Sequence, residues 1–152
     1  MEFFDVLEKD CADPAFQDAF RAYFGELGVK VTNWDGLFAE ISQAPDCAFV
    51  RRDGQGRIVG FLLMASQEMT SGFFTTRIGC MEEFYVAPEY RRQGHGMALL
   101  AMAEEHLSKA GCPYAILTTQ TAAAFYMKRG YRLQRGISAR NKADVYVKSL
   151  WV

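Results

Sequence analysis

The feature that most constrains the fold of this sequence is a glycine-rich turn between a strand-like run and a long amphipathic segment. The turn reads RRQGHG (residues 91–96); CMEEFYV precedes it and MALLAMAEEHLSKA follows it. A helix that begins in such a turn leaves backbone N–H groups unpaired, and its dipole adds positive potential there. Glycine has no Cβ, so a ligand can approach the backbone closely. The segment therefore predicts a phosphate-binding strand–loop–helix unit.

Two widespread phosphate loops fit this segment poorly. A P-loop requires GxxxxGK[ST], and the chain contains no such string. A dinucleotide-binding loop requires a third small residue after the second glycine, but Leu99 occupies that position. Both nucleotide-binding interpretations are therefore disfavoured.

The rest of the chain predicts helices interspersed among strands, which indicates an α/β fold with a mixed sheet and helices on its faces. Hydrophobic periodicity and turn residues set the expected elements. Strands are predicted at residues 2–9, 47–52, 57–66, 71–86, 114–119, 131–136 and 144–152, and helices at 14–28, 34–43, 97–110 and 122–129. Asp13 is the predicted N-cap of the first helix, and Thr121 that of the last.

Length and composition predict one domain over residues 1–152. The net charge is −1, which argues against a broad nucleic-acid or membrane surface. No apolar run approaches the roughly 20 residues of a membrane span, and the acidic start does not resemble a signal peptide. The four cysteines show no metal-ligand spacing, so no metal is expected. We expect a cytoplasmic protein.

The glycine-rich segment resembles the central motif of the GNAT superfamily of N-acetyltransferases, [R/Q]-x-x-G-x-[G/A]. Arg91, Gly94 and Gly96 match it, and VAPEY (residues 86–90) is similar to the family's usual lead-in. A second segment, Ala122 to Tyr131, resembles the family pattern A-x-x-FY-x-x-x-GF. The resemblance covers about residues 46–135. It implies a mostly antiparallel central sheet whose strands splay apart at a site for acetyl-CoA.

The resemblance also implies which residues contact acetyl-CoA. The pantetheine arm would pair with the backbone of Phe84, Tyr85 and Val86, and the pyrophosphate would bind the loop amides. Arg91 and Arg92 would add positive charge. The implied loop residues are Arg91, Arg92, Gln93, Gly94, His95, Gly96, Met97 and Ala98. Thr119 stands where the family often has an asparagine that contacts the cofactor.

Acetyl transfer to an amine needs a base, because an ammonium with a pKa of ~10.4 has no lone pair with which to attack. Relatives that acetylate polyamines imply Glu82 as this base, directly or through water. Glu83 points to the other face of the strand and is the alternative. The resemblance implies Tyr126 as the acid that serves the CoA thiolate. A structural glutamate and a packed aromatic remain the alternatives for these two positions.

The resemblance leaves the acceptor open among small-molecule and peptide amines. A non-catalytic acyl-CoA-binding regulatory or sensor domain on the same fold is the competing hypothesis. Residues 150–152, Leu-Trp-Val, are apolar, and a homodimer is one arrangement that would cover them.

Overall fold

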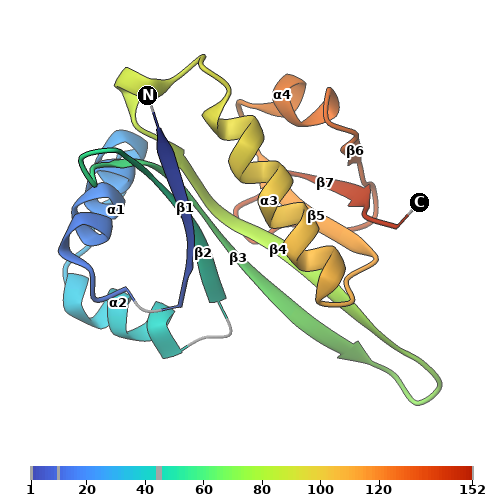
Figure 1. The fold of residues 1–152 in the computed structure, drawn as a ribbon. Helices are drawn as coiled ribbons and strands as arrows, with labels where there is room; N and C mark the ends of the chain where they lie inside the picture. Colours follow the sequence, from blue (N-terminus) through green and yellow to red (C-terminus); the bar gives the residue numbers. More distant parts are fainter. Residues whose placement is uncertain (1, 10, 44–45, 152) are drawn as a thin grey trace. The chain divides into compact units, whose positions relative to one another are not determined.

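A computed structural model gives the structure of this chain and describes residues 2–9, 11–43 and 46–151 (Figure 1). Its elements follow the order β-α-α-β-β-β-α-β-α-β-β predicted above, with one short 3-10 turn, η1, before α3. The elements are β1 (Phe3–Glu8), α1 (Pro14–Leu27), α2 (Trp34–Gln43), β2 (Asp46–Asp53), β3 (Ile58–Thr70), β4 (Thr75–Val86), η1 (Pro88–Tyr90), α3 (His95–Lys109), β5 (Tyr114–Thr119), α4 (Ala123–Met127), β6 (Arg132–Leu133) and β7 (Asp144–Ser149).

The strands form one mixed sheet in the order β1-β2-β3-β4-β5-β7-β6. The pairings β1–β2, β2–β3, β5–β7 and β6–β7 are antiparallel. β4 and β5 are parallel and pair only from Ile78 to Cys80 and from Tyr114 to Ile116. Because β4 continues to Val86 and β5 to Thr119, each strand ends in a segment that does not pair with the other.

The chain divides into two compact units, each built from two segments. Unit 1 comprises Met1–Ala65 and Glu83–Ala103, and unit 2 comprises Ser66–Glu82 and Glu104–Val152. β3, β4 and α3 each run from one unit into the other. The predicted single domain stays a prediction.

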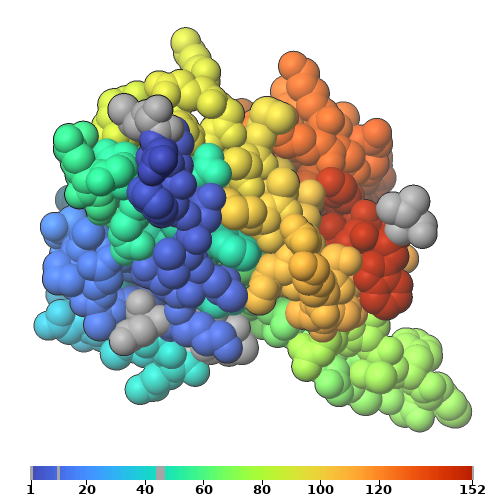
Figure 2. Space-filling model, in the orientation of Figure 1, coloured from blue at the N-terminus to red at the C-terminus, as the bar shows by residue number. Residues whose placement is uncertain are grey.

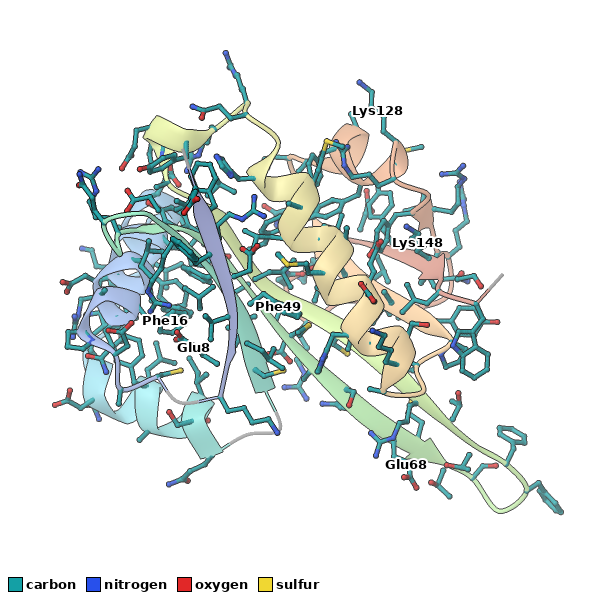
Figure 3. The ribbon with its side chains drawn as sticks, in the orientation of Figure 1. Glu8, Phe16, Phe49, Glu68, Lys128 and Lys148 are labelled. Atoms are coloured by element: carbon teal, nitrogen blue, oxygen red, sulfur yellow. The ribbon has the colours of Figure 1, made fainter. Side chains whose placement is uncertain are left out.

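The core of unit 1 is aromatic and lies under α1 and α2. Phe16 (labelled in Figure 3) and Phe20 on α1 are almost fully buried, and both rings pack against Phe61 of β3. A Cβ on the neighbouring Gly60 would instead meet Leu99 of α3, so that side chain lies on the opposite side of β3. Helices therefore cover both faces of this part of the sheet, as predicted.

The core of unit 2 includes the second half of α3, β5 and β7. Leu107, Ala115 and Tyr131 are almost fully buried. Gly79 of β4 lies so close to Leu107 that a Cβ would approach its Cδ1 within 2.7 Å. A turn at Ser71–Phe74 connects the end of β3 to the start of β4, and Phe73 in this turn is 97% exposed. This end of the hairpin is the light green surface in Figure 2.

Local signals in the sequence located several element ends correctly. The Asp13 carboxylate accepts a hydrogen bond from the Ala15 N–H, which caps α1 as predicted. Several predictions are wrong. The strand predicted at 71–86 begins only at Thr75, and the strand predicted at 131–136 spans only Arg132–Leu133. Thr121 does not cap α4, because the Thr119 hydroxyl accepts the hydrogen bond from the Ala122 N–H instead. The last strand ends at Ser149, and Val152 lies outside the described residues.

Candidate active site

The loop before α3 presents a row of backbone N–H groups. Gly94 caps the helix, since its carbonyl accepts the Ala98 N–H at 3.1 Å. Within residues 2–9, 11–43 and 46–151, the N–H groups from Gly94 to Met97 have no hydrogen-bond acceptor. Gly94 has φ 88° and Arg92 φ 64°, so the backbone here takes the left-handed turns that form concave anion sites. The loop can therefore bind a phosphate group.

The two arginines of the loop lie in different surroundings. Arg91 Nε donates to the Val86 carbonyl at 2.8 Å, and Arg91 Nη2 donates to Glu26 Oε2 at 2.6 Å. Its guanidinium thus holds the loop against β4 and α1. Arg92 is exposed and has no ion-pair partner within the described part of the chain. Arg92 is the loop cation that remains available to an anion.

His95 contributes to the loop by its position in the backbone, while its side chain packs inward. The side chain is buried, with its ring 4.5 Å from that of Phe3 and 5.7 Å from that of Tyr90. Arg51 Nη1 lies 3.1 Å from His95 Nδ1, so Nδ1 is the acceptor and the ring is neutral. Burial first, and then the Arg51 charge, lower the pKa of His95. These surroundings give His95 a structural role.

The end of β4 leads into the loop. Tyr85 is buried in the core of unit 1, and its ring lies 5.7 Å from that of Tyr23. The Val86 carbonyl already accepts from Arg91 Nε. This segment lies at the start of the loop, and the contacts of Phe84, Tyr85 and Val86 with the cofactor stay a prediction.

The adjacent glutamates of β4 have different environments. Glu82 belongs to unit 2 and is exposed, whereas Glu83 belongs to unit 1 and is half-buried. Desolvation raises the pKa of Glu83, and a hydrogen bond from Tyr23 partly opposes the rise. Glu83 Oε2 is buried and has no hydrogen-bond partner among the residues that the structure describes. Glu83 is thus a desolvated carboxyl whose pKa is raised.

Unit 2 holds the two remaining predicted residues. The Thr119 hydroxyl accepts the Ala122 N–H at 2.9 Å and so fixes the turn into α4. Tyr126 lies on α4, and burial raises its pKa to about 12. Unit 2 also contains a pocket of about 660 Å³ within the β6–β7 connection, lined by residues 133–139 and 142–145. No predicted site residue lines this pocket.

The predicted residues therefore form two groups. Unit 1 contains the end of β4, Glu83 and the loop, and unit 2 contains Glu82, Thr119 and Tyr126. Sequence reasoning missed the residues that support these groups: Tyr23 beside Glu83, Glu26 beside Arg91, Arg51 beside His95, and Glu104 beside Tyr131. The two members of each pair lie 27 to 65 positions apart in the sequence, so no local sequence pattern could have revealed them.

The fold matches solved structures over nearly the whole chain. A GNAT-family protein from Desulfovibrio desulfuricans has a TM-score of 0.74 at 15% identity, covering 98% of this chain and 99% of that one. A GNAT-family acetyltransferase from Staphylococcus aureus has 0.71 at 12%, covering 98% and 99%. Glucosamine-6-phosphate N-acetyltransferase from Arabidopsis thaliana has 0.72 at 18%, covering 92% and 98%. At such identities the likeness establishes the fold. Among curated proteins, none matches this sequence.

The fold and the loop define an acyltransferase of the GNAT type. The family model of the acetyltransferase (GNAT) domain matches residues 44–133, which is more than half of the chain. This chain belongs to the GNAT acetyltransferase family. Within the described residues no cluster of His, Cys, Asp or Glu could hold a metal ion, and no helix is long and apolar enough to cross a membrane.

Proposed function

We propose that this protein transfers an acetyl group from acetyl-CoA to a primary amine. The observation that carries the proposal is the loop before α3, whose N–H groups from Gly94 to Met97 lack acceptors in the described structure. A row of free donors at a helix start suits a pyrophosphate. In a GNAT-family chain, that pyrophosphate belongs to CoA.

The residues of the loop fit this ligand. An added Cβ at Gly94 would meet nothing within 4 Å, so the backbone there is open to a bound group. Arg92 offers a charge that no described acidic residue neutralises. Arg91 keeps the loop in place through Val86 and Glu26. Acetyl-CoA supplies the acetyl group as a thioester, and an N–C bond forms as the C–S bond breaks.

A carboxylate of β4 takes the proton from the amine. Glu82 is the base that the sequence predicts, and its exposed position allows proton transfer through water. The environment of Glu83 supports it as the alternative, because desolvation raises the pKa of Glu83. A base is most effective when its pKa lies near the working pH. We keep Glu82 as the proposed base and test it directly against Glu83.

Tyr126 stabilises the negative charge that develops on sulfur. Its pKa of about 12 keeps the phenol protonated at neutral pH. A thiol has a pKa of ~8.5, so complete proton transfer from Tyr126 to a thiolate would be uphill by roughly 5 kcal/mol. We therefore propose that the hydroxyl acts mainly as a hydrogen-bond donor to sulfur and keeps its proton.

The test combines ligand binding with turnover. Saturating acetyl-CoA should raise the melting temperature, since a ligand at 100 times its Kd stabilises by ~2.7 kcal/mol. ATP and NAD should not. CoA release in the presence of an amine panel, followed with a thiol reagent, should then identify an acceptor. Unchanged melting with millimolar acetyl-CoA would refute the cofactor assignment, and binding without CoA release would favour a sensor.

A further inference from the structure

A partly buried polar network lies in unit 2 around Tyr131. The Tyr131 side chain is 0% exposed, and its hydroxyl donates to Glu104 Oε2 at 2.8 Å. Lys148, labelled in Figure 3, donates from Nζ to both Glu104 oxygens at 3.0 and 3.1 Å. The network joins α3, the segment after α4, and β7. A paired, partly buried network of this kind restricts the geometry of its members.

Tyr131 in turn contacts Tyr126, the residue to which we assign the sulfur-side hydrogen bond. The two ring centroids lie 5.7 Å apart at an interplanar angle of 72°, an edge-on contact. The Tyr131 N–H also donates to the Tyr126 carbonyl at 3.2 Å. The side chain and the backbone of Tyr131 therefore both meet the same residue.

Helix α4 has little capacity to orient Tyr126 by itself. It has five residues, Ala123–Met127, and its N-cap Ala122 offers no side-chain cap. Helices this short are unstable without tertiary contacts. The direction of the Tyr126 phenol consequently depends on what packs against α4, and Tyr131 is a fully buried part of that packing.

The Tyr131 hydroxyl is a departure from the family pattern that this segment resembles, which ends in GF where this chain has Gly130-Tyr131. A phenylalanine would fill the same space but could not donate to Glu104. The partly buried Glu104 therefore has a hydrogen-bond partner in this chain that a phenylalanine at position 131 would not provide.

We propose that Tyr131, fixed by Glu104 and Lys148, is a positioning residue for Tyr126. This rests on the proposed function, because it concerns the geometry of one group in that reaction. Misplacing a reacting group by about 1 Å can lower a rate by up to ~100-fold. We expect Tyr131→Phe to lower kcat about tenfold while KM for acetyl-CoA stays within about twofold.

The decisive measurement is a double-mutant cycle on the full chain. If Tyr131 acts through Tyr126, then Tyr131→Phe should slow the wild-type background but have no further effect in Tyr126→Phe. Glu104→Gln should show the same dependence on Tyr126. Glu105→Gln is the matched control: it lies on the same helix, is exposed, and pairs only with Lys109 among the described residues. Its kcat should match the wild type.

A spectroscopic readout separates this proposal from the proposed function. In protein with isotope-labelled tyrosine rings, the NMR signals of Tyr126 can be assigned by their loss in Tyr126→Phe. These signals should shift in Tyr131→Phe and in Glu104→Gln. They should be unchanged in Glu105→Gln. Equal losses of kcat in both backgrounds, or unshifted Tyr126 signals, would overturn the positioning role. If the wild type acetylates no amine, the proposed function fails, and the ring signals still decide whether Tyr131 orients Tyr126.

Discussion

Glu83 and Tyr126 are candidate catalytic side chains whose chemistry the surrounding structure changes. Burial raises the pKa of both. Both pKa values shift upward because burial disfavours the charged form of any acid. The consequences differ. A carboxyl with a raised pKa becomes a better base near neutral pH, whereas a phenol with a raised pKa remains a hydrogen-bond donor at every physiological pH.

Replacing each β4 glutamate in turn should identify the base. If Glu82 takes the amine proton, Glu82→Gln removes the acidic limb of the pH–rate profile and leaves a rate that rises with free amine. A loss within the ~10²–10⁴ range typical of general base catalysis is expected. Glu83→Gln, the same change one residue away, is the matched control. If Glu83→Gln abolishes the limb and Glu82→Gln does not, the base is Glu83.

Glu83→Gln should also change stability in a pH-dependent way. The folded-state pKa of Glu83 is raised, so its favourable contribution is present at acid pH and is lost as pH rises through the folded pKa. Gln carries no charge and still accepts a hydrogen bond from Tyr23. The melting temperature of Glu83→Gln should exceed that of wild type at pH 8, and the difference should shrink at pH 4. A lower melting temperature at pH 8 would contradict this.

Among the elements, the strand–loop–helix unit of β4 and α3 carries the cofactor proposal, and its two glycines have separate roles. Gly94 has φ 88°, a conformation that L residues rarely adopt, although an added Cβ would meet no atom within 4 Å. Gly96 lies in the first turn of α3 and is not among the glycines with positive φ. The requirement at Gly94 is therefore conformational, and the requirement proposed at Gly96 is access for the pyrophosphate.

These roles predict opposite behaviour in two variants. Gly94→Ala should lower stability by about 1 kcal/mol, because the left-handed conformation is unfavourable for residues with a Cβ. Gly96→Val should change stability less but abolish the melting-temperature shift given by acetyl-CoA. Thermal melting with and without acetyl-CoA measures both effects. Normal acetyl-CoA binding by Gly96→Val would show that the loop does not carry the pyrophosphate.

At the scale of the molecule, three elements run through both compact units. β3, β4 and α3 each contribute residues to both cores, as Leu99 and Leu107 of α3 do. Unfolding one unit would remove packing partners from elements that continue into the other. This continuity supports the sequence-based expectation of a single domain, for which two-state unfolding is usual in chains of this size.

The two tryptophans allow a direct test of this cooperativity. Trp34 lies in unit 1 and Trp151 in unit 2. Trp34→Phe and Trp151→Phe leave one fluorescent reporter in each unit. Urea titrations of the two variants, corrected for any stability change seen by circular dichroism, should give coincident transitions for the reporter and the backbone. Transitions that separate within one variant would show that the units unfold independently.

The sequence alone determined the order of the elements, the position of the glycine loop and the family. These features depend on local rules, such as the Asp13 cap, hydrophobic periodicity and the RRQGHG turn, which a linear reading can detect. The same rules failed at α4, where the hydroxyl that meets the Ala122 N–H comes from Thr119 instead of Thr121.

Only the tertiary structure decided how the candidate groups are tuned. The raised pKa of Glu83, the use of Arg91 as a structural clamp and the Glu104–Tyr131–Lys148 network each require residues distant in sequence to meet. Desolvation depends on what covers a side chain, and a hydrogen bond depends on an acceptor within about 3 Å. Neither quantity is encoded in a residue's own neighbourhood along the chain, so only the folded structure reveals which glutamate is partly buried and which tyrosine contacts Tyr126.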